Sequence, residues 1–232
     1  MLATYPDARW MGGELAERLL AFACLPSRTL HVSRQQALIP GAGDVLLSQF
    51  IADTPAWSRL HRHWSAALTK LYCLPEMMPV PDEGLALAML PSTIWDEVQL
   101  LGGVTLVGPR IRRCIVREQV KMLKEQLGDL SYGFAVGPAA QLHAGWDQSI
   151  TLAFEHIAPI SLRWGQALQA RALQATLPAV AQRGFLRLPE GALQDANGPL
   201  FAGIEPAQAL QLTLSLIQRT DPQWLSLFPS IP

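Results

Sequence analysis

The sequence predicts a mainly α fold, a compact multi-helix single domain over residues 1–232, and it leaves room for a small β element. Three observations predict this fold. Apolar residues recur three and four positions apart in most segments, which is the period of a helix with one buried face. Prolines and glycines fall between these segments, where turns are expected. Hydrophobic residues make up 50% of the chain and charged residues 16%, as in a soluble protein with a substantial core.

The composition limits the class of protein. The chain has 18 Lys and Arg against 19 Asp and Glu, a formal net charge of -1, which argues against nucleic acid as the main partner. We find no apolar run of about 18 residues, as a membrane-spanning helix needs, and no secretory signal at the N-terminus. Three cysteines, each among apolar neighbours, indicate free buried thiols rather than disulfides: Cys24, Cys73 and Cys114. We therefore expect a cytoplasmic protein without membrane insertion.

The first third of the chain is expected to be helical. Apolar spacing and flanking prolines or capping residues predict helices over residues 13–24, 44–52 and 54–72, with an extended connection over residues 28–43. The third of these helices carries an apolar ridge that we expect to face the core. The ridge consists of Trp57, Leu60, Trp64, Leu68 and Leu71.

The next segments are shorter. Residues 74–82 contain three prolines and are expected to form a loop. A helix is expected over residues 91–101, ended by two consecutive glycines. The short apolar segments 85–90 and 104–107 are the candidate strand pair, and they account for the small β element in the prediction.

The apolar pattern, the charges and the flanking proline and glycine together predict one long helix over residues 109–127, around which the rest of the chain is organised. Pro109 suits the first turn of a helix and Gly128 suits its end. Apolar residues cover most of the circumference and are expected to be buried: Ile111, Ile115, Val116, Val120, Met122, Leu123 and Leu127. The basic residues fall on one narrow stripe: Arg110, Arg113, Arg117, Lys121 and Lys124.

The basic stripe has two interpretations. It is either a solvated face that keeps a buried helix soluble, or a docking edge for an acidic partner. Six of the 18 basic residues lie between Arg110 and Lys124, against two glutamates, although the whole chain is close to neutral. Our hypothesis assigns the five residues of the stripe to partner binding.

The C-terminal part is patterned less regularly. Residues 150–178 are expected to be mostly helical, with interruptions near Pro159 and Gly165, and residues 191–203 to form an exposed loop. A helix is favoured from Pro206 onward, although the alternation of Leu with polar residues also fits a strand. Aromatic and apolar residues near the end are expected to dock on the core, with a partner-binding anchor as the alternative: Trp224, Leu225, Leu227 and Phe228.

The sequence contains none of the common catalytic motifs. The sequence has no G-x-S-x-G elbow, no H-E-x-x-H and no phosphate-binding loop. His61 and His63 alternate, so on a helix they point to opposite sides and do not make a metal site. We expect no catalytic residues, no metal and no cofactor.

Two stretches resemble a known family. The first comprises Leu19 to Phe22 and continues from Leu25 to His31. The second comprises Ile111 to Ile115, then Leu123, Leu127, Gly128 and Asp129, and finally Tyr132 to Ala135. Together they resemble the SctK-type proteins, cytoplasmic accessory proteins of bacterial type III secretion systems. The resemblance covers residues 1–140, and residues 141–232 carry only a short similar stretch, Asp221 to Trp224.

The resemblance implies a function. SctK-type proteins are non-enzymatic adaptors that join the cytoplasmic domain of the inner-membrane ring protein SctD to the SctQ-containing pod of the sorting platform beneath the injectisome. The resemblance implies these partners but not the contact residues. Two other classes stay open at this point: a nucleic-acid-binding helical protein that uses the basic stripe, and an enzyme of unrecognised class.

Overall fold

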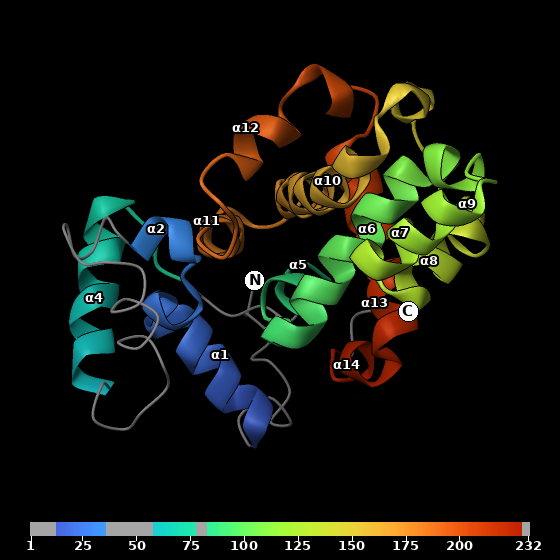
Figure 1. The fold of residues 1–232 in the computed structure, drawn as a ribbon. Coiled ribbons are helices and arrows are strands. Elements are labelled where there is room, and N and C mark those ends of the chain that lie inside the picture. Colours follow the sequence, from blue (N-terminus) through green and yellow to red (C-terminus); the bar gives the residue numbers. More distant parts are fainter. Residues whose placement is uncertain (1–12, 36–57, 78–82, 229–232) are drawn as a thin grey trace. The chain divides into compact units, whose positions relative to one another are not determined.

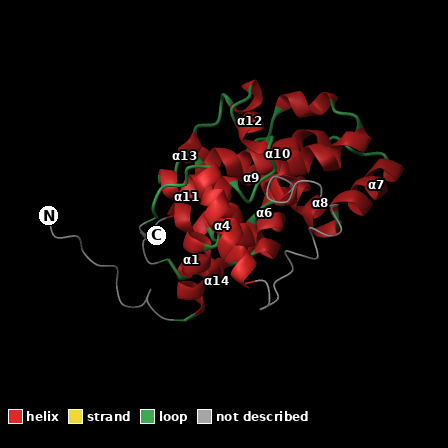
Figure 2. Cartoon of the chain, turned by 90° about the vertical axis from the view of Figure 1, so that its left-hand side faces the viewer, coloured by secondary structure: helices red, strands yellow, loops and turns green. Residues whose placement is uncertain are grey.

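Helices form the whole of the secondary structure in the part of the chain that the structure describes. The computed structural model describes residues 13–35, 58–77 and 83–228, and every element in these residues is a helix (Figures 1 and 2). The prediction of a mainly α fold is confirmed. The helix expected over residues 44–52 lies outside the described residues.

The two candidate strands are wrong. Residues 85–88 belong to helix α5 and residues 104–107 lie in the middle of helix α6. Both segments are fully or almost fully buried. A short apolar run looks the same in a buried strand and in a helix that is buried on all sides, so its period could not distinguish the two.

The contacts of the chain define two compact units, which we describe separately. Unit 1 consists of Met1–Met89, Thr176–Gly191 and Ser226–Pro232, and unit 2 of Leu90–Ala175 and Ala192–Leu225. Each unit therefore combines segments that are far apart in the sequence. A single domain over residues 1–232 stays a prediction.

Unit 1 holds the N-terminal helices and one helix from the second half of the chain. Its described elements are α1 (Glu14–Cys24), η2 (Pro26–Thr29), α2 (Val32–Gln35), α4 (Ser58–Leu71), α5 (Glu83–Ala88) and α11 (Pro178–Phe185). The helix expected over residues 13–24 is confirmed. So is the described part of the helix expected over residues 54–72.

The core of unit 1 joins these segments. Leu30, Leu68, Leu74 and Leu186 form one buried cluster. In the predicted ridge, Trp64 and Leu68 are buried as expected, but Leu71 at the end of α4 is exposed. Leu60 in the first turn of α4 is half-buried, and Trp57 lies outside the described residues.

Unit 2 is built on two long helices. Its elements are α6 (Ser92–Arg112), α7 (Arg117–Leu127), α8 (Asp129–Val136), α9 (Ala139–Leu142), η4 (Asp147–Thr151), η5 (Phe154–His156), α10 (Ile157–Leu173), α12 (Ala192–Ala196), η6 (Pro199–Phe201), α13 (Pro206–Thr220) and α14 (Pro222–Ser226). Helices α6 and α10 pack along each other, and α13 packs against both. Their contact surfaces form the core of this unit.

Helix α6 is longer than the sequence predicts. Gly102 and Gly103 do not end it, because they lie inside α6 where α10 approaches most closely. Pro109 does not start a new helix either, since α6 continues through it to Arg112. The chain then turns over residues 113–116, and α7 starts at Arg117. The single helix expected over residues 109–127 is therefore wrong, although its end before Gly128 is confirmed.

Other C-terminal expectations are partly corrected. Helix α10 runs without interruption from Ile157 to Leu173, with Pro159 in its first turn, where the missing N–H has no helical partner to lose. The expected loop over residues 191–203 contains α12 and η6, and buries Ala192, Ala196 and Phe201. The helix from Pro206 is confirmed as α13.

The chain end and the cysteines can be compared with their predicted burial. Trp224, Leu225 and Phe228 are buried, so the predicted docking of the C-terminal residues is confirmed for these three. Of the cysteines, only Cys114 is buried, whereas Cys24 and Cys73 are exposed. The expectation of three core thiols is wrong for these two: Cys24 is the last residue of α1, and Cys73 lies in the turn after α4.

Candidate interaction surfaces

The five basic residues predicted as one stripe are divided between two helices and a turn. Arg110 lies in the last turn of α6 and is half-buried. Its Nε donates a hydrogen bond of 2.7 Å to the carbonyl oxygen of Leu152, and its guanidinium lies 3.9 Å from the centroid of the Phe154 ring. Arg110 therefore holds the segment after η4 against α6 and is not an open docking residue.

The other four basic residues are exposed. Arg113 lies in the turn after α6, and three residues form the α7 basic edge: Arg117, Lys121 and Lys124. Lys124 Nζ is 3.0 Å from Asp129 Oδ1, and Lys121 Nζ is 3.8 Å from Glu125 Oε1. Both pairs are solvent-exposed, so each contributes little to stability and competes weakly with a partner's carboxylate.

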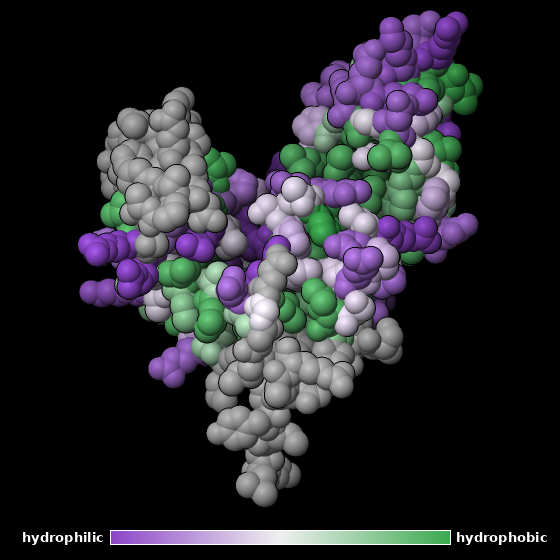
Figure 3. All heavy atoms as spheres, turned by 90° about the horizontal axis from the view of Figure 1, so that it is seen from below, coloured by the Kyte–Doolittle hydropathy of each residue, from purple (hydrophilic) through white to green (hydrophobic). Residues whose placement is uncertain are grey.

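Apolar side chains are exposed around this edge. Ile115 is 89% exposed and Leu130 is 88% exposed, and Val116 and Met122 are exposed to a smaller extent. We expected Ile115, Val116 and Met122 to be buried, which is wrong because the turn at residues 113–116 rotates α7 relative to the predicted helix. Figure 3 shows hydrophobic surface beside strongly hydrophilic surface at the right of the view, the side on which α7 and α8 lie in Figure 1.

We call these exposed residues the α7 surface. It comprises Arg113, Ile115, Val116, Arg117, Lys121, Met122, Lys124 and Leu130. Large apolar side chains exposed together with cations are typical of a protein-binding surface. Exposure of the apolar side chains to water is unfavourable, and a bound partner removes it. The inward side of α7 is formed by Leu123 and Leu127, which are buried as predicted.

Arg112, which lies outside the predicted stripe, holds this region together. Arg112 Nη1 donates to the carbonyl oxygen of Ala135 at 3.3 Å, and Nη2 donates to that of Ala144 at 2.9 Å. A methyl group on Gly108 would lie 2.6 Å from Arg112 Nη1, so the glycine leaves room for this guanidinium. Arg112 thus ties the end of α8 and the chain after α9 to α6. In the sequence, Arg112 stands within the second resembling stretch, and Gly108 lies four residues before it.

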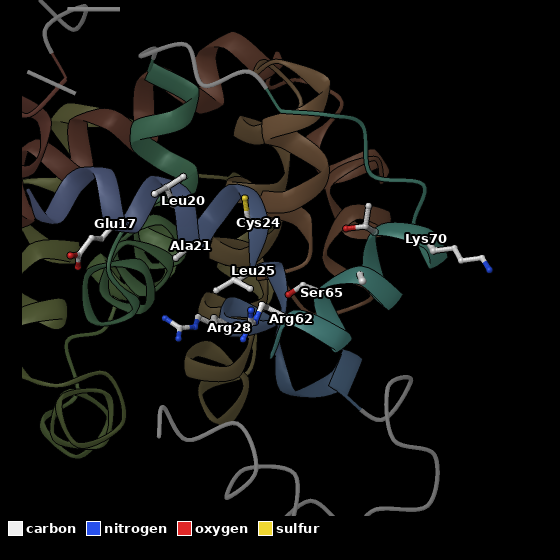
Figure 4. Close-up of a pocket in the computed structure, with 11 residues that line it drawn as sticks. Glu17, Leu20, Ala21, Cys24, Leu25, Arg28, Arg62, Ser65 and Lys70 are labelled. Atoms are coloured by element: carbon white, nitrogen blue, oxygen red, sulfur yellow. The ribbon is translucent and has the colours of Figure 1, made fainter. Parts of the chain in front are cut away.

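A second surface lies in unit 1, where sequence reasoning proposed no site. A groove of about 780 Å³ runs between α1 and α4 (Figure 4). Helix α1 lines it with Glu17, Leu20, Ala21 and Cys24, and α4 lines it with Arg62, Ser65, Ala66, Thr69 and Lys70. Leu25 and Arg28 follow α1 and complete the lining. The signal in the sequence was the spacing of Glu17, Leu20, Ala21 and Cys24 at i, i+3, i+4 and i+7, which places them on one face of α1.

The groove is electropositive. Among the described residues, its lining contains three cations, Arg28, Arg62 and Lys70, and one anion, Glu17, a formal charge of +2 in a chain whose formal net charge is -1. The rest of the lining is apolar or small. Cations beside an apolar surface attract anionic partners and orient them.

A buried polar network lies directly behind the groove. Ser27 Oγ is 2.8 Å from Ser65 Oγ and 3.0 Å from His61 Nδ1. A serine beside a histidine is the arrangement of an activated nucleophile. Here, however, Ser27 and His61 are each only 1% exposed, so a substrate has no access to them. The network instead fixes η2 against α4 and thereby fixes the wall of the groove.

The described ranges, residues 13–35, 58–77 and 83–228, contain neither a metal-binding cluster nor a membrane-spanning helix. There, no group of three or more His, Cys, Asp or Glu side chains is arranged to hold a metal ion. His61 is buried and His63 is exposed, so they point to different sides of α4 as their spacing predicts. Within the same ranges no helix is both long and apolar enough to cross a bilayer.

The α7 surface and the groove share no residue, and each lies wholly within one unit. Both combine apolar side chains with cations. Comparison with models of protein families, with curated proteins and with solved structures found no significant match.

Proposed function

We propose that this chain is a non-enzymatic adaptor of the SctK type, which joins the cytoplasmic domain of SctD to the SctQ-containing pod of a type III secretion sorting platform. The observation that carries the proposal is the α7 surface. Ile115 and Leu130 are almost fully exposed there, and Ile115 lies in the turn between Arg113 and Arg117, which are also exposed. Such residues are of use to a protein that binds another protein, and they do not form a catalytic cleft.

The distribution of surfaces supports a bridging role. A bridge fails if its two partners compete for one patch, so an adaptor needs two independent contact surfaces. The α7 surface belongs to unit 2 and the groove between α1 and α4 belongs to unit 1. Two partners can therefore be held without sharing a contact residue.

The residues that carry the resemblance also fit this proposal. In the first stretch, Ser27 and Leu30 are buried, and in the second Leu123 and Leu127 are buried. Gly128 has φ +81°, a conformation that residues with a side chain rarely adopt. These buried motif residues hold the helices in place, whereas Arg113 and Ile115 of the second stretch are exposed on the α7 surface.

A pull-down experiment tests the proposal. The purified full chain is offered the SctD cytoplasmic domain and SctQ, first separately and then together. We expect both to bind, and Arg113→Glu with Arg117→Glu to abolish the binding of one partner while sparing the other. Arg219→Glu is the matched control, because Arg219 is exposed on α13 and belongs to neither surface.

Two results would contradict the proposal. Failure of the wild-type chain to bind either partner would remove its basis. Binding of duplex DNA that falls steeply with salt and is lost in the Arg113 and Arg117 reversals would instead identify a nucleic-acid-binding surface. Equal retention of both partners by the double variant would separate the adaptor function from the α7 surface.

A further inference from the structure

We infer that the groove between α1 and α4 binds an acidic amphipathic helix of a partner protein. The inference rests on the proposed adaptor function, in which this groove is the second of two contact surfaces. It goes further because it names the chemistry of the bound segment: a helix with aliphatic residues on one side and carboxylates beside them.

The walls of the groove have the dimensions of a helix-binding site. Glu17 and Cys24 are seven positions apart on one wall, and Arg62 and Lys70 are eight positions apart on the other. At 1.5 Å per residue each wall is about 11 Å long, or about two turns of an α-helix. A third helix laid between them would place residues at i, i+3, i+4 and i+7 in contact with both walls.

The floor of the groove suits aliphatic side chains. Ala21 and Ala66 face it from the two helices, and small residues let a third backbone approach closely. Leu20 lies on the same face of α1 and is 64% exposed, an apolar contact that no described residue covers fully. Figure 4 shows Leu20, Ala21 and Leu25 along one side of the groove.

Charges select an acidic helix. Arg62 and Lys70 lie two turns apart on the α4 wall and are both exposed, and Arg28 lies at the end of η2. On the α1 wall, the only charged residue of the described lining is Glu17. A helix with carboxylates two turns apart on the side that faces α4 would therefore be held in one register, whereas a basic helix would be repelled.

The shape of the groove favours a helix over a small molecule. Small-molecule sites enclose most of the ligand's surface. Here Leu20, Cys24, Arg62, Ala66 and Lys70 are all exposed, so the groove is an open trough. A second copy of the chain docked symmetrically through the same groove would bring like charges together, which is unfavourable.

A designed peptide tests the inference directly. The probe is a fluorescein-labelled helical peptide of about four turns, with leucines at positions i, i+3, i+4 and i+7 and glutamates beside them. Its control has lysine in place of every glutamate. Fluorescence anisotropy with the full chain should show binding of the acidic peptide and at least about tenfold weaker binding of the basic one.

Variants of the groove then locate the binding. Arg62→Glu with Lys70→Glu should weaken the acidic peptide about tenfold or more and should improve the basic peptide. Leu20→Ser, which removes the apolar contact without adding a charge, should weaken both peptides. These side chains are exposed, so the variants should fold, which circular dichroism checks. Arg219→Glu should leave both affinities unchanged.

The outcomes separate this inference from the proposed function. If the wild-type chain binds neither SctD nor SctQ, the adaptor function fails and the inference loses the role on which it rests. If both partners bind but the groove variants retain both and the acidic peptide does not bind, the inference alone is overturned. A dimer of the chain that the same variants dissociate would show that a second copy occupies the groove, and would also overturn it.

Discussion

A methyl group on Gly103 would lie 1.6 Å from the carbonyl oxygen of Ser161, so α6 and α10 touch through their backbones at this point. The same is true one turn further along, where a methyl group on Gly165 would lie 1.7 Å from the carbonyl oxygen of Gln99. Gly103 of α6 faces the backbone of α10, and Gly165 of α10 faces the backbone of α6. Unit 2 therefore depends on two positions at which any side chain would push its central helices apart.

Gly103→Ala should destabilise the protein by about 3 kcal/mol or more, because the colliding atom is backbone and cannot move aside by a change of rotamer. Urea unfolding measures the effect. Gly133→Ala is the matched control, since a methyl group on Gly133 in α8 meets no atom within 4 Å. The control should be neutral or slightly stabilising, because alanine favours a helix over glycine by up to about 1 kcal/mol. Equal midpoints for the two variants would contradict the close approach of α6 and α10.

The same glycines explain why the sequence misplaced the helix boundaries. Two consecutive glycines and a proline are common at helix ends, and local pattern alone favoured breaks at Gly102 and Pro109. The structure keeps the helix because α10 packs against the glycine side and compensates for their low helix propensity. Helices α1 and α13, which have no glycine or proline after their first residue, were predicted correctly.

The candidate site was predictable only in part. The cations on α7 were identified from their spacing, but the turn at residues 113–116 exposes Ile115 and engages Arg110 elsewhere. A stripe drawn for one ideal helix cannot anticipate such a turn, because it depends on tertiary contacts. The groove in unit 1 was not identified at all, since its two walls are about 40 residues apart in the sequence.

A buried amide pair provides a second prediction. Gln99 Nε2 donates to Gln169 Oε1 at 3.0 Å, and Gln169 Nε2 donates to the carbonyl oxygen of Trp95 at 3.2 Å. Gln99→Leu should cost about 1–3 kcal/mol, because it leaves the buried Gln169 oxygen without this donor. Adding Gln169→Met should recover part of the loss, since the polar group that was left is then removed. A double-mutant cycle by chemical unfolding measures the coupling, and strictly additive losses would contradict it.

His143 makes stability depend on pH. Burial lowers the pKa of His143 below its ordinary value of 6.5. The unfolded chain then binds the proton more tightly than the folded chain, so this contribution to stability is present above pH 6.5 and is lost as pH falls through the lowered pKa. In addition, His143 Nδ1 accepts a 2.9 Å hydrogen bond from the N–H of Gly145, which a protonated ring cannot do.

The measurement compares the free energy of unfolding of the wild type and His143→Gln at pH values on both sides of 6.5. Glutamine keeps an acceptor but does not titrate. The advantage of the wild type over the variant should therefore shrink as the solution is acidified. A difference that stays constant with pH would mean that His143 titrates alike in the folded and unfolded chains.

Arg110 and Arg117 are seven positions apart in the predicted stripe. The same substitution should lower the free energy of unfolding much more at Arg110 than at Arg117. Arg110 donates to the Leu152 carbonyl oxygen and covers the Phe154 ring, whereas Arg117 is exposed at the start of α7. Arg110→Met should lower the free energy of unfolding by about 1–3 kcal/mol, because a charge-assisted hydrogen bond and a cation–π contact are both lost. Arg117→Met should change it by less than about 0.5 kcal/mol, as is usual for exposed positions.

Binding should show the reverse order. With both variants kept well below their unfolding midpoints, Arg117→Met should weaken the partner that the α7 surface holds, and Arg110→Met should bind it as the wild type does, because its guanidinium is already engaged within unit 2. Pull-down at several salt concentrations measures this, since a docking cation loses its effect as salt screens it. If Arg110→Met were fully stable yet lost the partner, the original stripe would be the docking edge after all, and the turn between α6 and α7 would have to rearrange on binding.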